Sequence, residues 1–282
     1  MVMPIILWSS HQIVNLYGQG DFMITMDTIV DEMENIKRIK NRIVVFSGKG
    51  GVGKTTISIN IAFAMAKYGF KVGLMDADIT GPNIPKMLGM KGDMLVNDNG
   101  KIVPMERSGV KLVSMGFMID EKNPIIWRGP LKTKAIKQFL SDVDWGDIDT
   151  LIVDLPPGTG DEILTIIQYL HPNKAVIVTT PENVSVLDAS RAVEMAKKFS
   201  IPFIGVIENM SGVICPKCGY EIDIFGKGGG KKMADEKGVE FLGFCPMDVS
   251  IRNMIEKGKI PVVDGDCEFS KSMIKIAEKL SR

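Results

Sequence analysis

The sequence has few of the residues that build several common kinds of functional site. Only two of its 282 residues are histidines and only four are cysteines. Two histidines, His11 and His171, leave little material for a histidine-rich metal site or for Ser-His-Asp catalysis. Four cysteines are too few for a disulfide scaffold. These counts exclude a secreted disulfide-rich domain and point away from histidine-based enzymes.

Long apolar runs and an excess of one charge are also missing. No stretch approaches the roughly 20 uninterrupted apolar residues that a membrane-spanning helix needs, and residues 1–10 lack the basic start and apolar core of a secretory signal. The 34 Lys and Arg residues balance the 34 Asp and Glu residues. A broad basic surface for nucleic acid is therefore not expected. We expect a cytoplasmic protein that binds neither membrane nor nucleic acid.

What the sequence does contain is a regular alternation of short apolar segments with helical stretches. The apolar segments have the sequences IVVF, KVGLMD, LIVDLP, AVIVTT, FIGVIEN and FLGF. Near-continuous apolar strands separated by helices indicate a parallel sheet that is buried on both faces. We therefore predict an α/β fold with a mostly parallel sheet and helices on both faces.

Two regions depart from this alternation. Residues 1–25 show no sustained period, and residues 27–40 have apolar positions at helical spacing. We assign residues 1–40 to an N-terminal extension with a leading helix, and residues 41–282 to one domain. Residues 92–114 form short segments around Asn97–Gly100, which we interpret as a hairpin inserted beside the main sheet.

A phosphate-binding motif lies between the first predicted strand and the helix that follows. Gly48, Gly53, Lys54 and Thr55 satisfy the pattern G-x-x-x-x-G-K-[ST]. In such a loop the glycines let backbone N–H groups converge on phosphates, the lysine neutralises the β and γ oxygens, and the Thr hydroxyl binds Mg²⁺. We therefore predict a P-loop NTPase that binds ATP and Mg²⁺ through the following loop residues: Gly48, Lys49, Gly50, Gly51, Val52, Gly53, Lys54, Thr55 and Thr56.

Carboxylates follow two of the predicted strands. Asp76 and Asp78 lie at the end of the second strand, and Asp154 ends the strand LIVD, 100 residues after Lys54. A lone aspartate at a strand end is often only a helix cap, but three beside a P-loop favour a nucleotide site. We expect Asp154 to hold Mg²⁺ through water.

The second lysine of the loop, Lys49, gives the motif the form GKGGVGKTT. This form resembles the deviant Walker A class of ATPases, which includes MinD, ParA and the nitrogenase iron protein. The resemblance implies that Lys49 reaches the phosphates of a partner subunit, in a homodimer that encloses the nucleotides. It also implies that Asp76 lies on the Mg²⁺ side of the site and that Asp78 orients or deprotonates the attacking water. It also places Asn209 and Pro246 in an adenine pocket. The alternative for Lys49 is a solvated loop residue.

A close pair of cysteines forms a separate candidate metal site within residues 209–226. Cys215 and Cys218, in CPKCG, are spaced so that both sulfurs can bind one metal. A zinc ion or a four-iron cluster generally takes four protein ligands, and a two-fold dimer would supply them from two chains. Cys245 is expected to be a small buried residue and Cys267 a surface thiol.

The ordered combination of motifs resembles the Mrp-type (ApbC-like) iron-sulfur carrier ATPases. These proteins join the same P-loop to a C-x-x-C that follows a strand ending in ENM, and carry WRGP, which is residues 127–130 here. The resemblance covers roughly residues 41–259. It implies a bridging [4Fe-4S] cluster on Cys215 and Cys218 that is assembled and passed to apo-proteins. Our hypothesis is that ATP binding and slow hydrolysis gate this transfer.

Three other interpretations use the same residues. The amphipathic C-terminal segment, with Phe269, Met273 and Ile276 on its apolar face, could lie on a membrane as part of a MinD- or ParA-like positioning ATPase. The cysteine pair could instead hold a structural zinc at the dimer interface, because thiolates suit both metals. A C-x-x-C redox switch is the third, but such motifs belong at helix N-termini.

Overall fold

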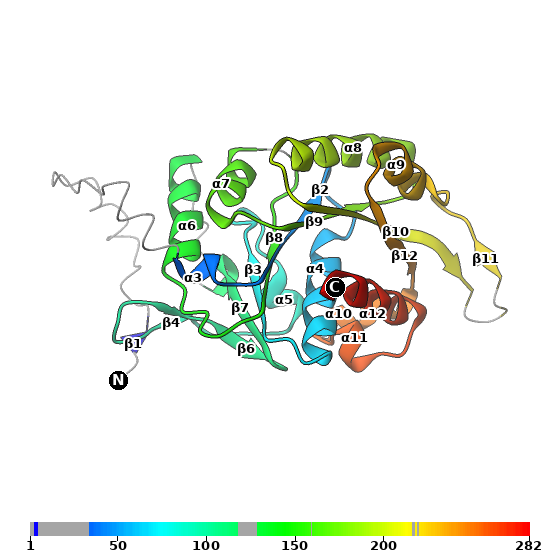
Figure 1. Ribbon diagram of the computed structural model, residues 1–282. Coiled ribbons are helices and arrows are strands. Elements are labelled where there is room, and N and C mark those ends of the chain that lie inside the picture. Colours follow the sequence, from blue (N-terminus) through cyan, green and yellow to red (C-terminus); the bar gives the residue numbers. More distant parts are fainter. Residues whose placement is uncertain (1–2, 5–33, 118–128, 159, 216–217, 219) are drawn as a thin grey trace.

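The computed structural model describes residues 3–4, 34–117, 129–158, 160–215, 218 and 220–282. Within them, one nine-stranded sheet runs through the centre of the molecule (Figure 1). Its strand order is β11-β10-β9-β2-β8-β3-β7-β6, and β12 pairs with β10 as well. The strands are β2 (Asn41–Ser47), β3 (Val72–Asp76), β6 (Met105–Arg107), β7 (Val110–Ser114), β8 (Thr150–Asp154), β9 (Lys174–Thr179), β10 (Phe203–Ile214), β11 (Glu221–Ile222) and β12 (Glu240–Met247).

The main body of the sheet is parallel, as the apolar segments predicted. Strand β2 pairs in parallel with both β8 and β9, and β3 pairs in parallel with β8 and β7. Every residue of β3 and of β8 is buried, which explains why these segments are almost continuously apolar rather than alternating. The antiparallel strands, β6 and β11, lie at the margins.

Helices cover both faces of the sheet (Figure 1). One layer contains α4, which follows the P-loop, and the C-terminal helices that pack beside it; the other contains α6 to α9. The helices of the first layer are α4 (Lys54–Lys67), α10 (Val249–Glu256), α11 (Pro261–Asp264) and α12 (Glu268–Ser281). Those of the second are α6 (Gly129–Ser141), α7 (Asp161–Leu170), α8 (Asn183–Lys198) and α9 (Gly229–Lys237). The predicted α/β fold with helices on both faces is confirmed.

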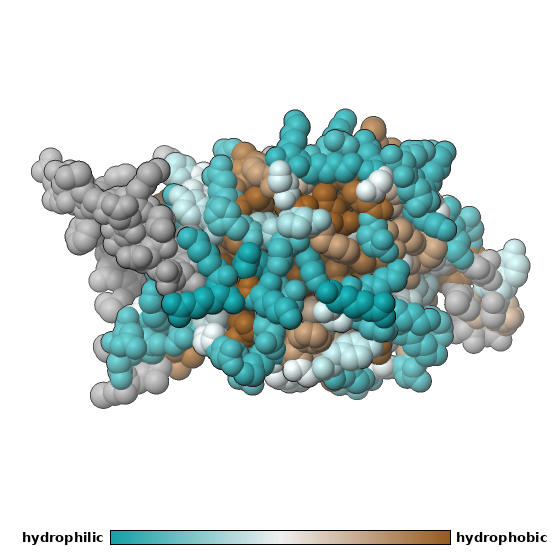
Figure 2. All heavy atoms as spheres, in the orientation of Figure 1, coloured by the Kyte–Doolittle hydropathy of each residue, from teal (hydrophilic) through white to brown (hydrophobic). Residues whose placement is uncertain are grey.

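The surface follows the same layering. In the view of Figure 2, hydrophilic residues cover the outer helices and hydrophobic residues gather between the helix layers. The apolar face of α12 is part of the core, because its residues Phe269, Met273 and Ile276 are buried and the helix packs on α4 and β12. That packing occupies the face which a membrane-bound alternative would need. No helix in the described part of the chain is both long and apolar enough to cross a membrane.

The predicted leading helix and the predicted hairpin are both represented in the structure. The helix predicted for residues 27–40 appears as α3 (Glu34–Lys37), and residues 5–33 lie outside the described part of the chain. The hairpin near residue 98 is present as β4 (Leu95–Val96) and β5 (Ile102–Val103), in a separate small sheet with β1 (Met3–Pro4).

The extent of that hairpin region was predicted wrongly. Residues 110–114 do not belong beside the main sheet, because they form β7, a strand that pairs with β3 along its whole length. The short helix α5 (Ile84–Met87) and a 3₁₀ turn, η2 (Met115–Phe117), complete this side of the molecule.

Candidate functional site at the carboxyl edge of the sheet

The P-loop connects the end of β2 to the start of α4, and two of its glycines have no room for a side chain. A Cβ on Gly48 would lie 2.3 Å from the backbone of Asp188 in α8. Gly53 has φ of +83°, and a Cβ there would lie 2.3 Å from Nδ2 of Asn209. Helix α4 begins at Lys54, so its first N–H groups face the loop, where they can bind anions. The loop therefore takes its shape from close contacts with α8 and β10.

Asp154 is the point where the side chains of the loop and helix meet. Its Oδ1 lies 2.7 Å from Lys54 Nζ and accepts a hydrogen bond of 2.6 Å from the Ser58 hydroxyl. Its Oδ2 accepts a hydrogen bond of 2.7 Å from the Thr55 hydroxyl. Asp154 is completely buried and Lys54 is nearly so. A buried carboxylate needs such donors to offset its desolvation, so this cluster is stable only as a set.

Asp76 lies directly beside Asp154, because the two residues are register partners in the parallel pair β3 and β8. The Ser114 hydroxyl and the Ile84 N–H donate hydrogen bonds to its Oδ2 at 3.0 and 3.3 Å. Burial, followed by the charge of Asp154, raises the pKa of Asp76 to about 7, and the hydrogen bonds and Lys54 oppose that rise. Two adjacent carboxylates and a Thr hydroxyl form an oxygen-rich donor set of the kind that Mg²⁺ prefers.

Asp78 follows this pair in a half-buried position. Its N–H donates a hydrogen bond of 3.2 Å to Asp76 Oδ1, and its own Oδ1 accepts one of 3.1 Å from the Gly81 N–H. Asp76 therefore holds the backbone that carries Asp78. The water-orienting role of Asp78 stays a prediction.

Lys49 forms an ion pair within its own chain. Its Nζ lies 3.4 Å from Glu182 Oε2, and the two side chains are 36% and 43% exposed. Glu182 immediately precedes α8, and the hydroxyls of Thr180 and Ser185 both lie 3.4 Å from the same carboxylate oxygen. An exposed pair of this kind contributes little to stability. Lys49 can therefore leave Glu182 at little cost, and its action across a dimer stays a prediction.

Asn209 joins the P-loop to β10. Its Nδ2 donates a hydrogen bond of 2.9 Å to the Val52 carbonyl, and the residue is buried. Its register partner on β12 is Cys245, which is next to the half-buried Pro246. The two residues assigned to an adenine pocket thus lie on neighbouring strands at the loop. Their contact with a base stays a prediction.

The cysteine pair lies on the hairpin that β10 forms with β11, which projects from the body of the molecule (Figure 1). Cys215 is half-buried, Cys218 is exposed, and the Cys215 N–H donates a hydrogen bond of 2.9 Å to the Tyr220 carbonyl. In the returning arm Tyr220, Ile222 and Ile224 are 71%, 42% and 56% exposed. Among the residues that the structure describes, which leave out 216, 217 and 219 of this hairpin, no group of three or more Cys, His, Asp or Glu residues comes together.

The remaining cysteines lie elsewhere. Cys245 is buried with its Sγ 3.6 Å from Met273 Sδ, and burial raises the pKa of its thiol. It is the small core residue that was predicted. Cys267 was predicted to be a surface thiol, but it is half-buried at the start of α12 with its Sγ 3.2 Å from the Ser270 hydroxyl, because the start of that helix packs on α11.

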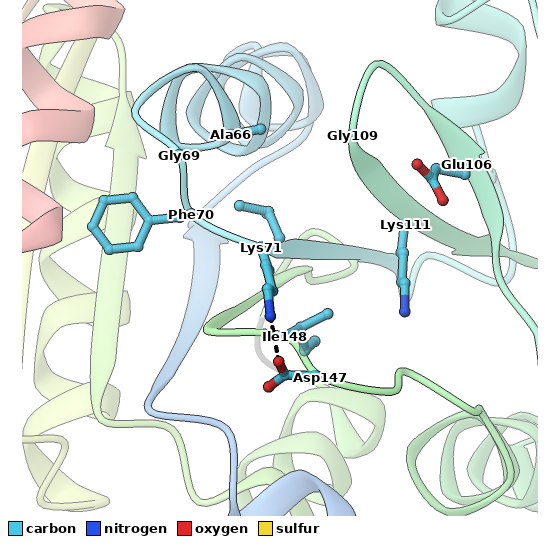
Figure 3. Close-up of a pocket in the computed structure, with 10 residues that line it drawn as sticks. Ala66, Gly69, Phe70, Lys71, Glu106, Gly109, Lys111, Asp147 and Ile148 are labelled. Atoms are coloured by element: carbon cyan, nitrogen blue, oxygen red, sulfur yellow. Dashed lines mark hydrogen bonds and ion pairs between the residues drawn. The ribbon is translucent and has the colours of Figure 1, made fainter.

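A surface pocket of about 310 Å³ lies at the opposite edge of the sheet, where β3 and β7 begin (Figure 3). The side chains of Lys71 and Asp147 form an ion pair there, and Lys111 donates a hydrogen bond to the Trp145 carbonyl. Charges of both signs line this pocket, and none of the residues predicted to bind nucleotide or metal takes part. It is therefore separate from the candidate site.

Comparison with known proteins identifies the family. The model of the NUBPL iron-transfer P-loop NTPases, a ParA-type family, matches residues 38–281. The chain belongs to this family. A relative from Methanocaldococcus jannaschii, named iron-sulfur cluster carrier protein, is 52% identical over 250 residues, covering 88% of this chain and 86% of the relative. A relative from Pyrococcus abyssi with the same name is 50% identical, and the match covers 95% of this chain and 93% of the relative.

Solved structures agree with the NUBPL-family fold. A nucleotide-binding protein from Archaeoglobus fulgidus, in complex with ADP and with cobalt found in it, is 37% identical and gives a TM-score of 0.73 over 83% of this chain and 92% of that one. MinD from Pyrococcus horikoshii, complexed with Mg-ADP, gives 0.65 over 86% and 96% of the two chains at 23% identity. The second likeness supports the fold alone.

Several residues of this NUBPL-family site were missed by sequence reasoning. Ser58 follows Lys54 by four positions, which places both on one side of α4; that spacing was the available signal. Ser114 ends β7 as the register partner of Asp76, but it could be found only once β7 was recognised as a strand. Glu182 contacts Lys49 across 133 residues of sequence, and no local sequence pattern predicts this contact. Of the WRGP segment, Trp127 and Arg128 lie outside the described residues.

Proposed function

We propose that this protein is an ATP-dependent iron-sulfur cluster carrier. In this proposal two copies bind a [4Fe-4S] cluster between them as cargo and pass it to apo-proteins. The observation that carries it is the course of β10, which contacts the P-loop through Asn209 and continues directly to Cys215. The family match and the name shared by the two archaeal relatives support it.

The nucleotide half of the proposal uses the buried cluster around Asp154. Lys54, now 2.7 Å from Asp154, would bind the β and γ phosphates of ATP together with the loop N–H groups. Thr55, Asp76 and Asp154 have the donor chemistry to hold Mg²⁺, which neutralises phosphate charge when bound. Asp78 would orient the attacking water. Because most of these groups act by position and charge, hydrolysis is expected to be slow and to change conformation.

Both the nucleotide chemistry and the cluster binding of this proposal require a dimer. Within the described residues Lys49 is held by an exposed ion pair, and it would exchange Glu182 for the phosphates of the partner subunit. Two thiolates per chain are half of the ligands that a four-iron cluster generally takes. A two-fold axis through the cysteine hairpins would complete the set. ATP binding would bring the chains together and change the spacing or exposure of the thiolates, and hydrolysis would reverse it.

The decisive experiment measures the metal content of the dimer. Protein reconstituted anaerobically with iron and sulfide should show absorbance near 400 nm and iron and sulfide in a cluster stoichiometry of about four each per dimer. Cys218→Ala should lose the cluster and retain ATP binding, whereas Cys267→Ala, which changes a thiol outside the hairpin, should retain both. Zinc without sulfide in the wild type would establish the structural-zinc alternative instead.

A second experiment tests the dimer through Lys49. Sedimentation or light scattering with ATP should give a dimer for the wild type and a monomer for Lys49→Ala. Lys232→Ala, which changes an exposed lysine paired with Glu236 on α9, is the control and should dimerise. A wild-type protein that stays monomeric with ATP and cluster present would contradict the proposal.

A further inference from the structure

One buried carboxylate next to the site has no role in the nucleotide chemistry. Glu208 on β10 has no exposed surface. Its Oε1 accepts hydrogen bonds from the Ser211 hydroxyl at 2.7 Å and from the Gly228 N–H at 2.8 Å. Its Oε2 accepts one from the Gly230 N–H at 2.7 Å. All three contacts are short, so this carboxylate is firmly held.

The three donors come from both arms of the cysteine hairpin. Ser211 lies on the outgoing arm, four residues before Cys215. Gly228 and Gly230 lie where the returning arm enters α9, at the N-terminal end of that nine-residue helix. The free N–H groups of a helix N-terminus favour an anion. Glu208 is such an anion from the chain itself, and it joins the two arms at their base.

The adjacent residue ties the same strand to the nucleotide loop. Successive side chains of a strand point to opposite faces of the sheet. Glu208 is accordingly directed to α9, whereas Asn209 is directed to the loop and donates to the Val52 carbonyl. One short stretch of β10 is therefore fixed on one face to the P-loop and on the other to the base of the cysteine hairpin.

The backbone changes direction just beyond this point. The register between β10 and β12 shifts between residues 209 and 213, and Met210 and Gly212 have φ of +57° and +77°. The regular ladder is thus interrupted between Asn209 and the hairpin. Glu208 contacts Ser211 within this interruption and Gly228 on the returning arm beyond it, so its side chain connects the regular part of β10 to the hairpin.

We propose that Glu208 is a positioning residue that fixes the cysteine hairpin relative to the P-loop. Through it, a movement of Val52 on nucleotide binding reaches Cys215 and Cys218. The inference rests on the proposed carrier function, which it deepens by naming the connection between the two sites. It assigns Glu208 no contact with nucleotide or cluster.

Glu208→Gln tests this connection while keeping the shape of the side chain. One acceptor oxygen becomes an NH₂ group that faces a backbone or hydroxyl donor. Loss of the cluster to an iron chelator should become about tenfold faster and should no longer change when ATP is added. Because Asn209 and the P-loop are untouched, the Kd for ATP should stay within about twofold of the wild type.

A matched control separates the connection from general loosening of α9. Glu194→Gln removes an exposed partner of Lys237, at the far end of the same helix. It should leave both cluster release and its response to ATP unchanged. If Glu194→Gln has the same effect as Glu208→Gln, or if Glu208→Gln weakens ATP binding as much as it speeds release, the role is only structural and the inference is wrong.

Hydrogen–deuterium exchange of the metal-free protein gives a second measurement that needs no cluster. In the wild type, ATP should change the exchange of residues 211–230, and Glu208→Gln should abolish that change. An unchanged ATP response in the variant overturns the inference even if the protein carries clusters. A wild type that shows the response but binds no cluster refutes the carrier function and leaves the connection standing. If Glu208→Gln does not fold, Ser211→Ala removes one of the three donors and should reduce the response in part.

Discussion

The nucleotide loop and the cysteine hairpin are built in opposite ways. Around Asp154 every interacting side chain is buried or half-buried, and the carboxylate is held by three donors from its own chain. On the hairpin, Cys218 and the apolar side chains of Tyr220 and Ile224 are exposed. The first region is shaped by its own chain before any ligand arrives. The second presents its groups to whatever binds there.

Lys54→Ala should have the largest effect and would sharpen this comparison. It removes the cation from two adjacent buried carboxylates and takes away the main phosphate ligand. The affinity for ATP should fall about 100-fold or more, as measured by titration with a fluorescent ATP analogue. Lys71→Ala changes an exposed lysine at the opposite edge of the sheet and should bind ATP as the wild type does. Equal affinities for Lys54→Ala and wild type would remove the loop from the nucleotide site.

The pH dependence of stability should reveal the buried carboxylate of the same region. The folded protein retains the proton on Asp76 up to about pH 7, whereas the unfolded chain releases it near its ordinary pKa of 3.8. Stability from this group is therefore complete below about pH 4 and is lost as the pH rises through 7. Between about pH 5 and pH 7, Asp76 should lower the free energy of unfolding by about 1 kcal/mol for each pH unit of increase, which is its contribution to the slope of stability against pH.

Denaturant unfolding without Mg²⁺ or nucleotide measures that slope. Asp76→Asn should flatten it, because the amide has no proton to release. Glu256→Gln, which changes an exposed carboxylate of α10, should keep it. An identical slope in Asp76→Asn and wild type would show that Asp76 does not titrate in this range.

Ser58→Ala should have a smaller effect on the same cluster. It deletes one of the three donors to Asp154, and the free energy of unfolding should fall by about 1–2 kcal/mol. Urea denaturation measures this. Ser281→Ala, near the exposed C-terminus, is the control and should change little. If the two variants are equally stable, the cluster depends less on each member than its burial suggests.

The smallest effect is expected on the hairpin. Ile224→Ser replaces an exposed apolar side chain, so the stability of the single chain should change by less than about 0.5 kcal/mol. Thermal unfolding of the metal-free protein measures this, with Val249→Ser, another exposed position, as the control. If Ile224→Ser lowers the free energy of unfolding as much as Ser58→Ala does, the hairpin is part of the packed structure and the contrast between the two regions is wrong.

The same contrast explains which features the sequence could predict. The P-loop is a local motif whose glycines and lysine lie within nine residues, so its place between β2 and α4 followed from spacing. The cysteine pair was found in the same way. The apolar periodicity of most strands also predicted the sheet, because strands buried on both faces are nearly continuous in hydrophobicity.

Features that depend on distant parts of the chain were not predicted. Strand β7 was missed because polar residues and Gly109 precede it and Ser114 ends it, so the apolar run is too short to indicate a buried strand. The contact between Lys49 and Glu182, and that between Glu208 and Gly228, join residues that only the fold brings together. Cys267 was placed on the surface because the packing of α11 against α12 was not foreseen.

The length of β10 has a kinetic consequence. Cys215 follows Asn209 by six positions, and the bend at Met210 and Gly212 lies between them, so the two sites are closer than the about 20 Å of a fully extended segment. Because the cysteine hairpin projects from the body of the molecule, we expect neither ligand to block the access of the other. On the proposed function, ATP and the cluster can therefore bind in either order, and both orders give the same dimer with both ligands bound.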